Sequence, residues 1–288
     1  MLVIIGSVVV IASVVGGYLA NGGHLEVLFQ PFEVMIIVGA AIGGFIIANR
    51  KPVLSATGKA IPALLKGERH DKTAYLELLT MLYSVFKLAK SKGALALEQH
   101  VEHPHDSSLF QRFPTFLADE HAVTFFCDYL RLLTLGTDNH HEMETLMDED
   151  LETHRAEHHA VASAIAATAD GMPALGIVAA VLGVIHTMGS ITEPPAVLGH
   201  LIGGALVGTF MGVLLSYGFV GPIASALKNV YDSETKYYTC IKVGLLAYLN
   251  GYAPAVAVEF ARKTLFSTVR PTFYEVEERV GALPSFTG

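Results

Sequence analysis

The chain has 288 residues, of which 52% are hydrophobic and only 16% are charged, and its formal net charge is −8. Soluble domains carry about a quarter charged residues, so this composition argues against a soluble globular enzyme and indicates an integral membrane protein. The acidic balance also argues against nucleic acid as a partner.

Four long uncharged runs follow one another along the chain. A run of about 20 apolar residues can cross a bilayer as a helix, so we predict membrane helices in 1–23, 34–49, 171–192 and 201–227. The second run is short and needs residues before Glu33 or local thinning of the bilayer. The first run lacks the basic start and the cleavage site of a signal peptide, so a retained helix is expected.

The basic residues fall into two blocks. All 19 Lys and Arg lie in 50–155 or 228–279, and because Lys and Arg near span ends stay inside, both blocks and both termini are predicted to be cytoplasmic. The sequence thus predicts an all-α integral membrane protein with four transmembrane helices and a large helical cytoplasmic portion. Its predicted parts are membrane helices 1 and 2 (1–49), a cytoplasmic helical domain (50–170), membrane helices 3 and 4 (171–227), and C-terminal cytoplasmic helices with a tail (228–288).

Three helices are predicted between the second and third spans. The first begins after Asp71, a residue typical of a helix N-cap, and ends at Gly93. The second covers 121–135 and ends at Gly136. The third runs from about 141 through 169 and can continue into the third span. The tail 284–288 is predicted to be frayed.

Small residues line one face of several predicted spans. Such faces allow close helix packing in lipid, either within the chain or with a neighbouring subunit, and both uses remain open. The residues concerned are Gly39 and Gly43, Gly176, Ala179, Ala180 and Gly183, and Gly204, Gly208 and Gly212.

The predicted spans contain no Asp, Glu, Lys or Arg. Ion pathways normally include an intramembrane charge, so either the protein moves no ion or another chain supplies the charged group. His186 titrates near neutral pH, but a lone His at the end of a span is more often a hydrogen-bonded interface residue. Thr209 could line a polar path or could bond back to its own helix.

Two prolines occupy similar places in the third and fourth spans. Pro173 stands at the start of the third span, where proline is structurally ordinary. Pro222 stands late in the fourth run, where it favours a kink or hinge. The two positions together suggest a level at which the cytoplasmic part could tilt.

One stretch of the sequence matches a metal-binding pattern. Residues 154–158 read H-x-x-E-H, which is typical of some zinc peptidases, but they lie in a stretch rich in His and acids and no third ligand is identifiable. The sequence therefore predicts no metal site, no cofactor and no catalytic residue.

Five segments of the sequence together match one known family, and they are 1–23, 147–154, 207–212, 250–254 and 258–265. In these segments the chain resembles the MotA family of flagellar motor stator proteins, and the resemblance runs nearly end to end. It implies a multi-pass protein of the bacterial inner membrane that generates torque and is not an enzyme.

The resemblance also implies a partner and an ion path. MotA subunits form a ring, a pentamer, around the helices of two MotB chains, which supply the membrane carboxylate and anchor the complex to peptidoglycan. Pro173 and Pro222 match the two functional prolines of the family, and Thr209 and Ala180 match positions that face the ion path. Sodium-driven relatives carry Thr where this chain has Ala180, so protons are favoured.

A rotor contact is implied in the cytoplasmic portion. Lys90 and Glu98 match the charged pair that engages the rotor protein FliG. The family often has Arg where Lys90 stands, which keeps the charge but loses the bidentate geometry. Lys87 and Lys92 lie nearby and could make the same contact.

Three alternatives make distinct predictions. A TolQ/ExbB-like energiser of a periplasmic transducer predicts three spans, which the fourth uncharged run argues against. A self-sufficient channel or solute transporter predicts current from this chain alone. A membrane peptidase predicts bound zinc and a requirement for Glu157.

Overall fold

The computed structural model describes residues 2–66, 70–136 and 139–283, and every regular element within them is a helix. The predicted tail 284–288 lies outside the described residues. Four helices are long and apolar enough to cross a membrane, namely Leu2–Ala20, Leu25–Ala48, His140–Met188 and Pro195–Leu249. The predicted all-α class with four spans and a large helical portion between them is thus confirmed.

The chain divides into two compact units. The first comprises Met1–Gly67 and Ala156–Tyr231, and the second comprises Glu68–Arg155 and Asp232–Gly288. Two long helices, α9 (His140–Met188) and α11 (Gly221–Leu249), contribute residues to both units.

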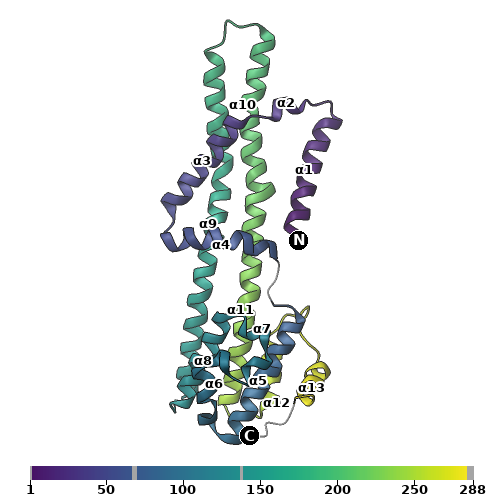
Figure 1. Cartoon of the computed structure of the whole chain (residues 1–288). Helices are drawn as coiled ribbons and strands as arrows, with labels where there is room; N and C mark the ends of the chain where they lie inside the picture. Colours follow the sequence, from purple (N-terminus) through teal and green to yellow (C-terminus); the bar gives the residue numbers. More distant parts are fainter. Residues whose placement is uncertain (1, 67–69, 137–138, 284–288) are drawn as a thin grey trace. The chain divides into compact units, whose positions relative to one another are not determined.

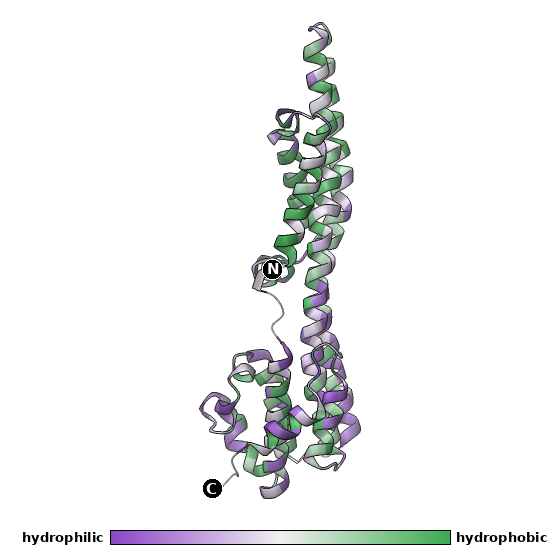
Figure 2. Cartoon of the chain, turned by 90° about the vertical axis from the view of Figure 1, so that its right-hand side faces the viewer, coloured by the Kyte–Doolittle hydropathy of each residue, from purple (hydrophilic) through white to green (hydrophobic). Residues whose placement is uncertain are grey.

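The first unit contains most of the apolar helices. α9 and the following α10 run side by side and are joined by a short connection (Figure 1). Hydrophobic residues predominate along α10 and along the part of α9 that runs beside it (Figure 2), as expected for segments surrounded by lipid. The other elements of this unit are α1 (Leu2–Ala20), α2 (Leu25–Leu28), α3 (Pro31–Ala48), α4 (Lys51–Lys66), α10 (Pro195–Leu215) and the π-helical turn η4 (Ser216–Val220).

Two small apolar cores hold the first unit together. Ile37 and Ala41 of α3 are buried with Met172 and Ala179 of α9. The other core joins α4 to α9 and the start of α11 through Ala60, Val161, Ala162, Ile165, Ala224, Leu227 and Tyr231. α1 has no fully buried residue, and it touches the rest of this unit at η4, where Val10 is half-buried near Gly218. Most of its surface is therefore available to lipid or to another chain.

The second unit is built around α5 (Lys72–Lys92). Its Tyr75, Leu78, Leu82 and Phe86 are fully buried in one large apolar core. The other elements of this unit include α8 (Glu120–Thr134), α12 (Pro254–Lys263), α13 (Phe273–Gly281) and the short helices η1 (Ala94–Leu97), α6 (Glu98–Glu102), η2 (Pro104–Asp106), η3 (Phe110–Arg112) and α7 (Pro114–Leu117).

The helix ends predicted at Asp71, Gly93 and Gly136 are present in the structure. The carboxylate of Asp71 accepts a hydrogen bond from the amide of Ala74 at 2.8 Å, which caps α5. Gly93 and Gly136 have φ values of 85° and 88°, which only glycine adopts without strain. α9 runs unbroken from His140 to Met188, so the predicted acidic helix does continue into the third span.

Candidate functional site

α9 and α10 approach closely along their small-residue faces. A β-carbon built on Gly208 would lie 3.0 Å from the backbone nitrogen of Ala180, and one on Gly212 would lie 2.7 Å from the Cα atom of Gly176. This face of α10 is therefore used for packing within the chain. Gly39 and Gly43 of α3 differ, because a β-carbon on either would have no neighbour within 4 Å.

The two predicted ion-path residues lie at this approach. Ala180 and Thr209 are both half-buried, and Thr209 follows Gly208, which contacts Ala180. Other hydroxyls in this unit bond back to their own helix, as Thr168 does to Ala164 and Thr187 to Gly183. Within the described residues Thr209 makes no such bond, so its hydroxyl remains available to a polar ligand.

The two predicted prolines differ in their surroundings. Pro173 lies inside α9. Pro222 is the second residue of α11 and follows the π-helical turn η4 after one intervening residue, Gly221, whose amide bonds to the carbonyl of Ser216. A π-helical turn shifts the bonding register by one residue, and α11 continues through Pro222 to Leu249.

Glu33 lies just before the predicted second span, 34–49. The candidate span of the structure begins earlier, at Leu25, and so includes Glu26 and Glu33. α3 starts with Pro31 and carries Glu33 in its first turn. Pro followed closely by an acid is a typical helix start, and this signal in the sequence could have placed Glu33 inside the helix.

The Glu33 carboxylate faces the glycine faces of α9 and α10. Its Oε2 atom is buried and makes no hydrogen bond within the described residues, and a β-carbon on Gly208 would lie 3.1 Å from it. A cleft of about 340 Å³ opens beside it and is also lined by Gln30, His186 and His200. His186 of the third span therefore lines the same cleft as Glu33.

The histidines of the H-x-x-E-H pattern pack against aromatic rings. In the second unit His154 lies edge-on to Tyr238, with ring centroids 4.9 Å apart, and in the first unit His158 stacks on Tyr231 at 4.3 Å. Across the described residues no group of three or more His, Cys, Asp or Glu is arranged to hold a metal ion.

The predicted rotor-binding residues cluster at the end of α5 and the start of α6. Lys87, Lys90, Lys92 and Glu98 are all exposed. Lys87 lies over the ring of Tyr83 at 5.8 Å, a cation–π contact. In the described part of the chain neither Lys90 nor Glu98 forms an ion pair, so both charges can meet a partner.

A second charged group lies on the same short helix. Arg131 of α8 pairs with Glu102 of α6 at 2.7 Å and with Asp128 at 2.7 Å. The hydrogen bond from Arg131 lowers the pKa of Glu102 below its usual value. This pair fixes α6, and hence Glu98 at its start, against α8.

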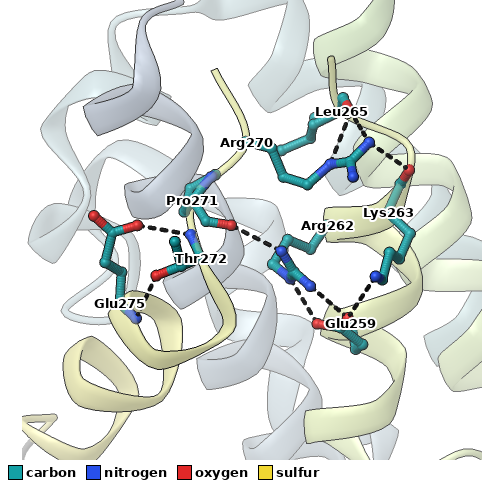
Figure 3. Close-up of polar contacts among 8 residues, drawn as sticks. All are labelled: Glu259, Arg262, Lys263, Leu265, Arg270, Pro271, Thr272 and Glu275. Atoms are coloured by element: carbon teal, nitrogen blue, oxygen red, sulfur yellow. Dashed lines mark hydrogen bonds and ion pairs between the residues drawn. The ribbon is translucent and has the colours of Figure 1, made fainter. Parts of the chain in front are cut away.

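The later part of the segment 250–265 forms a polar network with the residues that follow it, up to Glu275 (Figure 3). The guanidinium of Arg262 is largely buried, donates two hydrogen bonds of 2.6 Å to the carboxylate of Glu259, and donates a third to the carbonyl of Pro271 at 2.9 Å. Arg270 donates to the carbonyl of Leu265. The network therefore joins α12 to the loop before α13.

Comparison with known proteins decides the family. Residues 4–93 match Motility protein A N-terminal, and residues 118–239 match the MotA/TolQ/ExbB proton channel family. Motility protein A of Salmonella typhimurium is 47% identical over 98% of this chain and 96% of its own length, and that of Escherichia coli is 46% identical over the same shares. The chain belongs to the motility protein A family. Chemotaxis protein LafT of Vibrio parahaemolyticus is 33% identical over 95% of this chain and 96% of its own.

Solved structures of this family share the fold. The chain superposes on a chain of C. jejuni MotAB with a TM-score of 0.76 at 19% identity, covering 92% of this chain and 95% of that one. It superposes on a chain of the flagellar MotAB stator complex from Bacillus subtilis with a TM-score of 0.72 at 25% identity. That match covers 89% of this chain and 92% of the other chain.

The segment 147–154, which carries part of the resemblance to this family, lies in α9 and makes polar contacts with two neighbouring helices. Lys242 of α11, which is almost fully buried, pairs with Asp148, and the hydroxyl of Tyr129 donates to Asp150 at 3.0 Å. The acidic residues of this segment thus hold the start of α9 against α8 and α11 within the second unit.

Proposed function

We propose that this chain is a stator subunit of the bacterial flagellar motor, which works with a MotB-like partner to convert an ion-motive force into torque. The observation that carries this proposal is the 47% identity to a motility protein A over nearly the whole of both chains. Four candidate spans and this identity favour a stator over a TolQ/ExbB-like energiser, for which three spans were expected.

The ion site is proposed to form between this chain and its partner. Residues 171–227 carry Glu193 as their one ionisable residue of the Asp, Glu, Lys or Arg type, and it stands in the connection between α9 and α10. A partner carboxylate beside Thr209 and Ala180 would complete a proton site. The hydroxyl of Thr209, which makes no hydrogen bond within the described residues, supports this placement, since a hydroxyl can both donate to and accept from a carboxyl group.

A single ion carries a limited amount of work. One charge crossing 100 mV releases about 2.3 kcal/mol, whereas full inversion of a two-state equilibrium requires about 5.5 kcal/mol. We therefore expect many small steps, each biased by one proton. Pro173 and Pro222 are proposed to be the points at which the helices yield during such a step.

The rotor is proposed to contact Lys90 and Glu98, with Lys87 and Lys92 as neighbouring cations. Their exposure on α5 and α6 supports this assignment. We further propose a pentameric ring around two partner chains anchored to peptidoglycan, with FliG as the rotor protein and with both termini of this chain on the cytoplasmic side of the inner membrane.

Deletion of the gene tests the proposed function. We expect cells that still assemble flagellar filaments but cannot rotate them, and we expect the intact gene supplied in trans to restore swimming. Normal swimming after deletion would contradict the proposal, as would loss of the filaments themselves.

A further inference from the structure

Pro173 leaves a main-chain carbonyl without its usual partner. In an α-helix the amide of each residue bonds to the carbonyl four residues earlier, but proline has no amide hydrogen. The carbonyl that Pro173 cannot reach belongs to Ala169, which is only 2% exposed. A buried carbonyl without a donor costs free energy comparable to a lost hydrogen bond.

Ser216 supplies a donor to this carbonyl from the neighbouring helix. Its hydroxyl oxygen lies 2.6 Å from the carbonyl oxygen of Ala169, and its side chain is fully buried. Thr168 and Thr187, in the same unit, bond to carbonyls of their own helix. The Ser216 bond instead crosses between α9 and the first residue of the π-helical turn η4.

The local packing allows so short a side chain to span the gap. One turn before Ser216, Gly212 and Gly176 bring the two helices together without side chains between them. On the other side of Ser216, a β-carbon on Gly221 would lie 3.1 Å from the carbonyl oxygen of Ser216 and 4.0 Å from the β-carbon of Ala169. Small residues on both sides thus hold the hydroxyl within reach of the carbonyl.

We propose that Ser216 is a positioning residue for the proline-containing turn of α9. Its hydroxyl replaces the amide that Pro173 lacks and so ties that turn to η4, the turn that precedes Pro222. Because separating the two helices here would leave a buried hydroxyl and a buried carbonyl unpaired, the bond opposes opening at this level. Its relevance to torque rests on the proposed function, whereas the bond itself does not.

A double-mutant cycle with Pro173 tests this directly. In Pro173→Ala the new amide of residue 173 can donate to the Ala169 carbonyl, so the Ser216 hydroxyl becomes dispensable. The measurement is amide hydrogen exchange in the 165–180 segment of the purified chain in complex with its partner. We expect Ser216→Ala to speed this exchange by about tenfold in the native background and by less than about twofold in the Pro173→Ala background.

Controls separate this role from a general loss of stability. Thr187→Val removes a buried hydroxyl that bonds only within α9, and we expect it to leave exchange in 165–180 unchanged. Ser216→Cys keeps a weak donor of similar size and should give an intermediate rate, so it replaces Ser216→Ala in the cycle if that variant does not fold. Equal effects of the Ser216 substitution in both backgrounds, or no effect in the native background, would overturn the proposal. Neither result depends on whether the chain drives a motor.

Discussion

Gly176 of α9 lies so close to α10 that a β-carbon on it would stand 2.8 Å from the carbonyl oxygen of Gly208. That distance is shorter than real side chains tolerate against backbone, so the helices would have to move apart. The same approach places Ala180 beside Gly208 and Thr209, which makes this pair of helices the frame of the proposed ion path.

We therefore expect Gly176→Ala to destabilise the chain by about 1–3 kcal/mol through overpacking. Thermal unfolding of the purified protein in detergent measures the effect. Gly171→Ala, on the same helix, is the matched control, because a β-carbon there would have no neighbour within 4 Å. Helix propensity alone would make both variants more stable, so a loss in Gly171→Ala equal to that in Gly176→Ala would show that the close approach of the helices is not its cause.

Charge reversal tests the proposed rotor contact. Glu98→Lys should weaken swimming while leaving the fold intact, since Glu98 is exposed and forms no ion pair within the described residues. Each exposed pair contributes about 0–1 kcal/mol, so a partial loss is expected. A compensating reversal on the rotor should restore swimming, which is measured by spreading in soft agar.

Reversal of Lys87, Lys90 and Lys92 one at a time would identify the cation that acts with Glu98. The variant rescued by an opposite charge on the rotor marks the contact. If no rotor substitution rescues Glu98→Lys or any of the three, the contact lies elsewhere.

Arg262→Lys should lower the stability of the second unit by about 2 kcal/mol, because a lysine can make neither the paired bonds to Glu259 nor the bond to Pro271. Thermal unfolding of the purified chain provides the measurement. The control is Lys263→Gln, since Lys263 is 64% exposed and lies 3.8 Å from Glu259, and we expect a change below about 1 kcal/mol. A smaller effect for Arg262→Lys than for Lys263→Gln would refute this role.

Acid should loosen α13. Hydrogen bonds from Lys72 and Thr272 hold the pKa of Glu275 at about 2, below its ordinary value of 4.5. A lowered folded-state pKa gives stability that is present above the ordinary value and is lost as the pH falls toward about 2. The difference in unfolding temperature between the native chain and Glu275→Gln should therefore shrink from pH 5 toward pH 2.

Glu277→Gln serves as the control for this pH dependence, because Glu277 lies on the same helix and makes no hydrogen bond among the described residues. Its difference from the native chain should stay constant over the same range. A constant difference for Glu275→Gln as well would rule out the Lys72–Glu275 pair as the cause.

Periodic and compositional signals in the sequence predict most of this fold. Uncharged runs identify the spans, and Asp71, Gly93 and Gly136 mark helix ends because their side chains or φ values act locally. An uncharged run ends at its first acid and so leaves out Glu33, although Pro31 marks the start of α3.

The contacts between helices could not be predicted in the same way. The bond from Ser216 to Ala169 joins residues far apart in the chain and depends on the register of α9 against α10, which no local pattern encodes. The bidentate contact of Arg262 with Glu259 is local, but the burial that gives it weight comes from the loop at Pro271. The function is predicted from the resemblance of whole segments to a known family, because no single residue of the chain indicates it.

Proton flux in liposomes tests most directly whether this chain relies on a partner for its titrating acid. We expect liposomes that contain this chain alone to hold a pH gradient, and liposomes that also contain its MotB-like partner to dissipate it. A rapid flux through the chain alone, equal to that of the complex, would contradict a shared ion site.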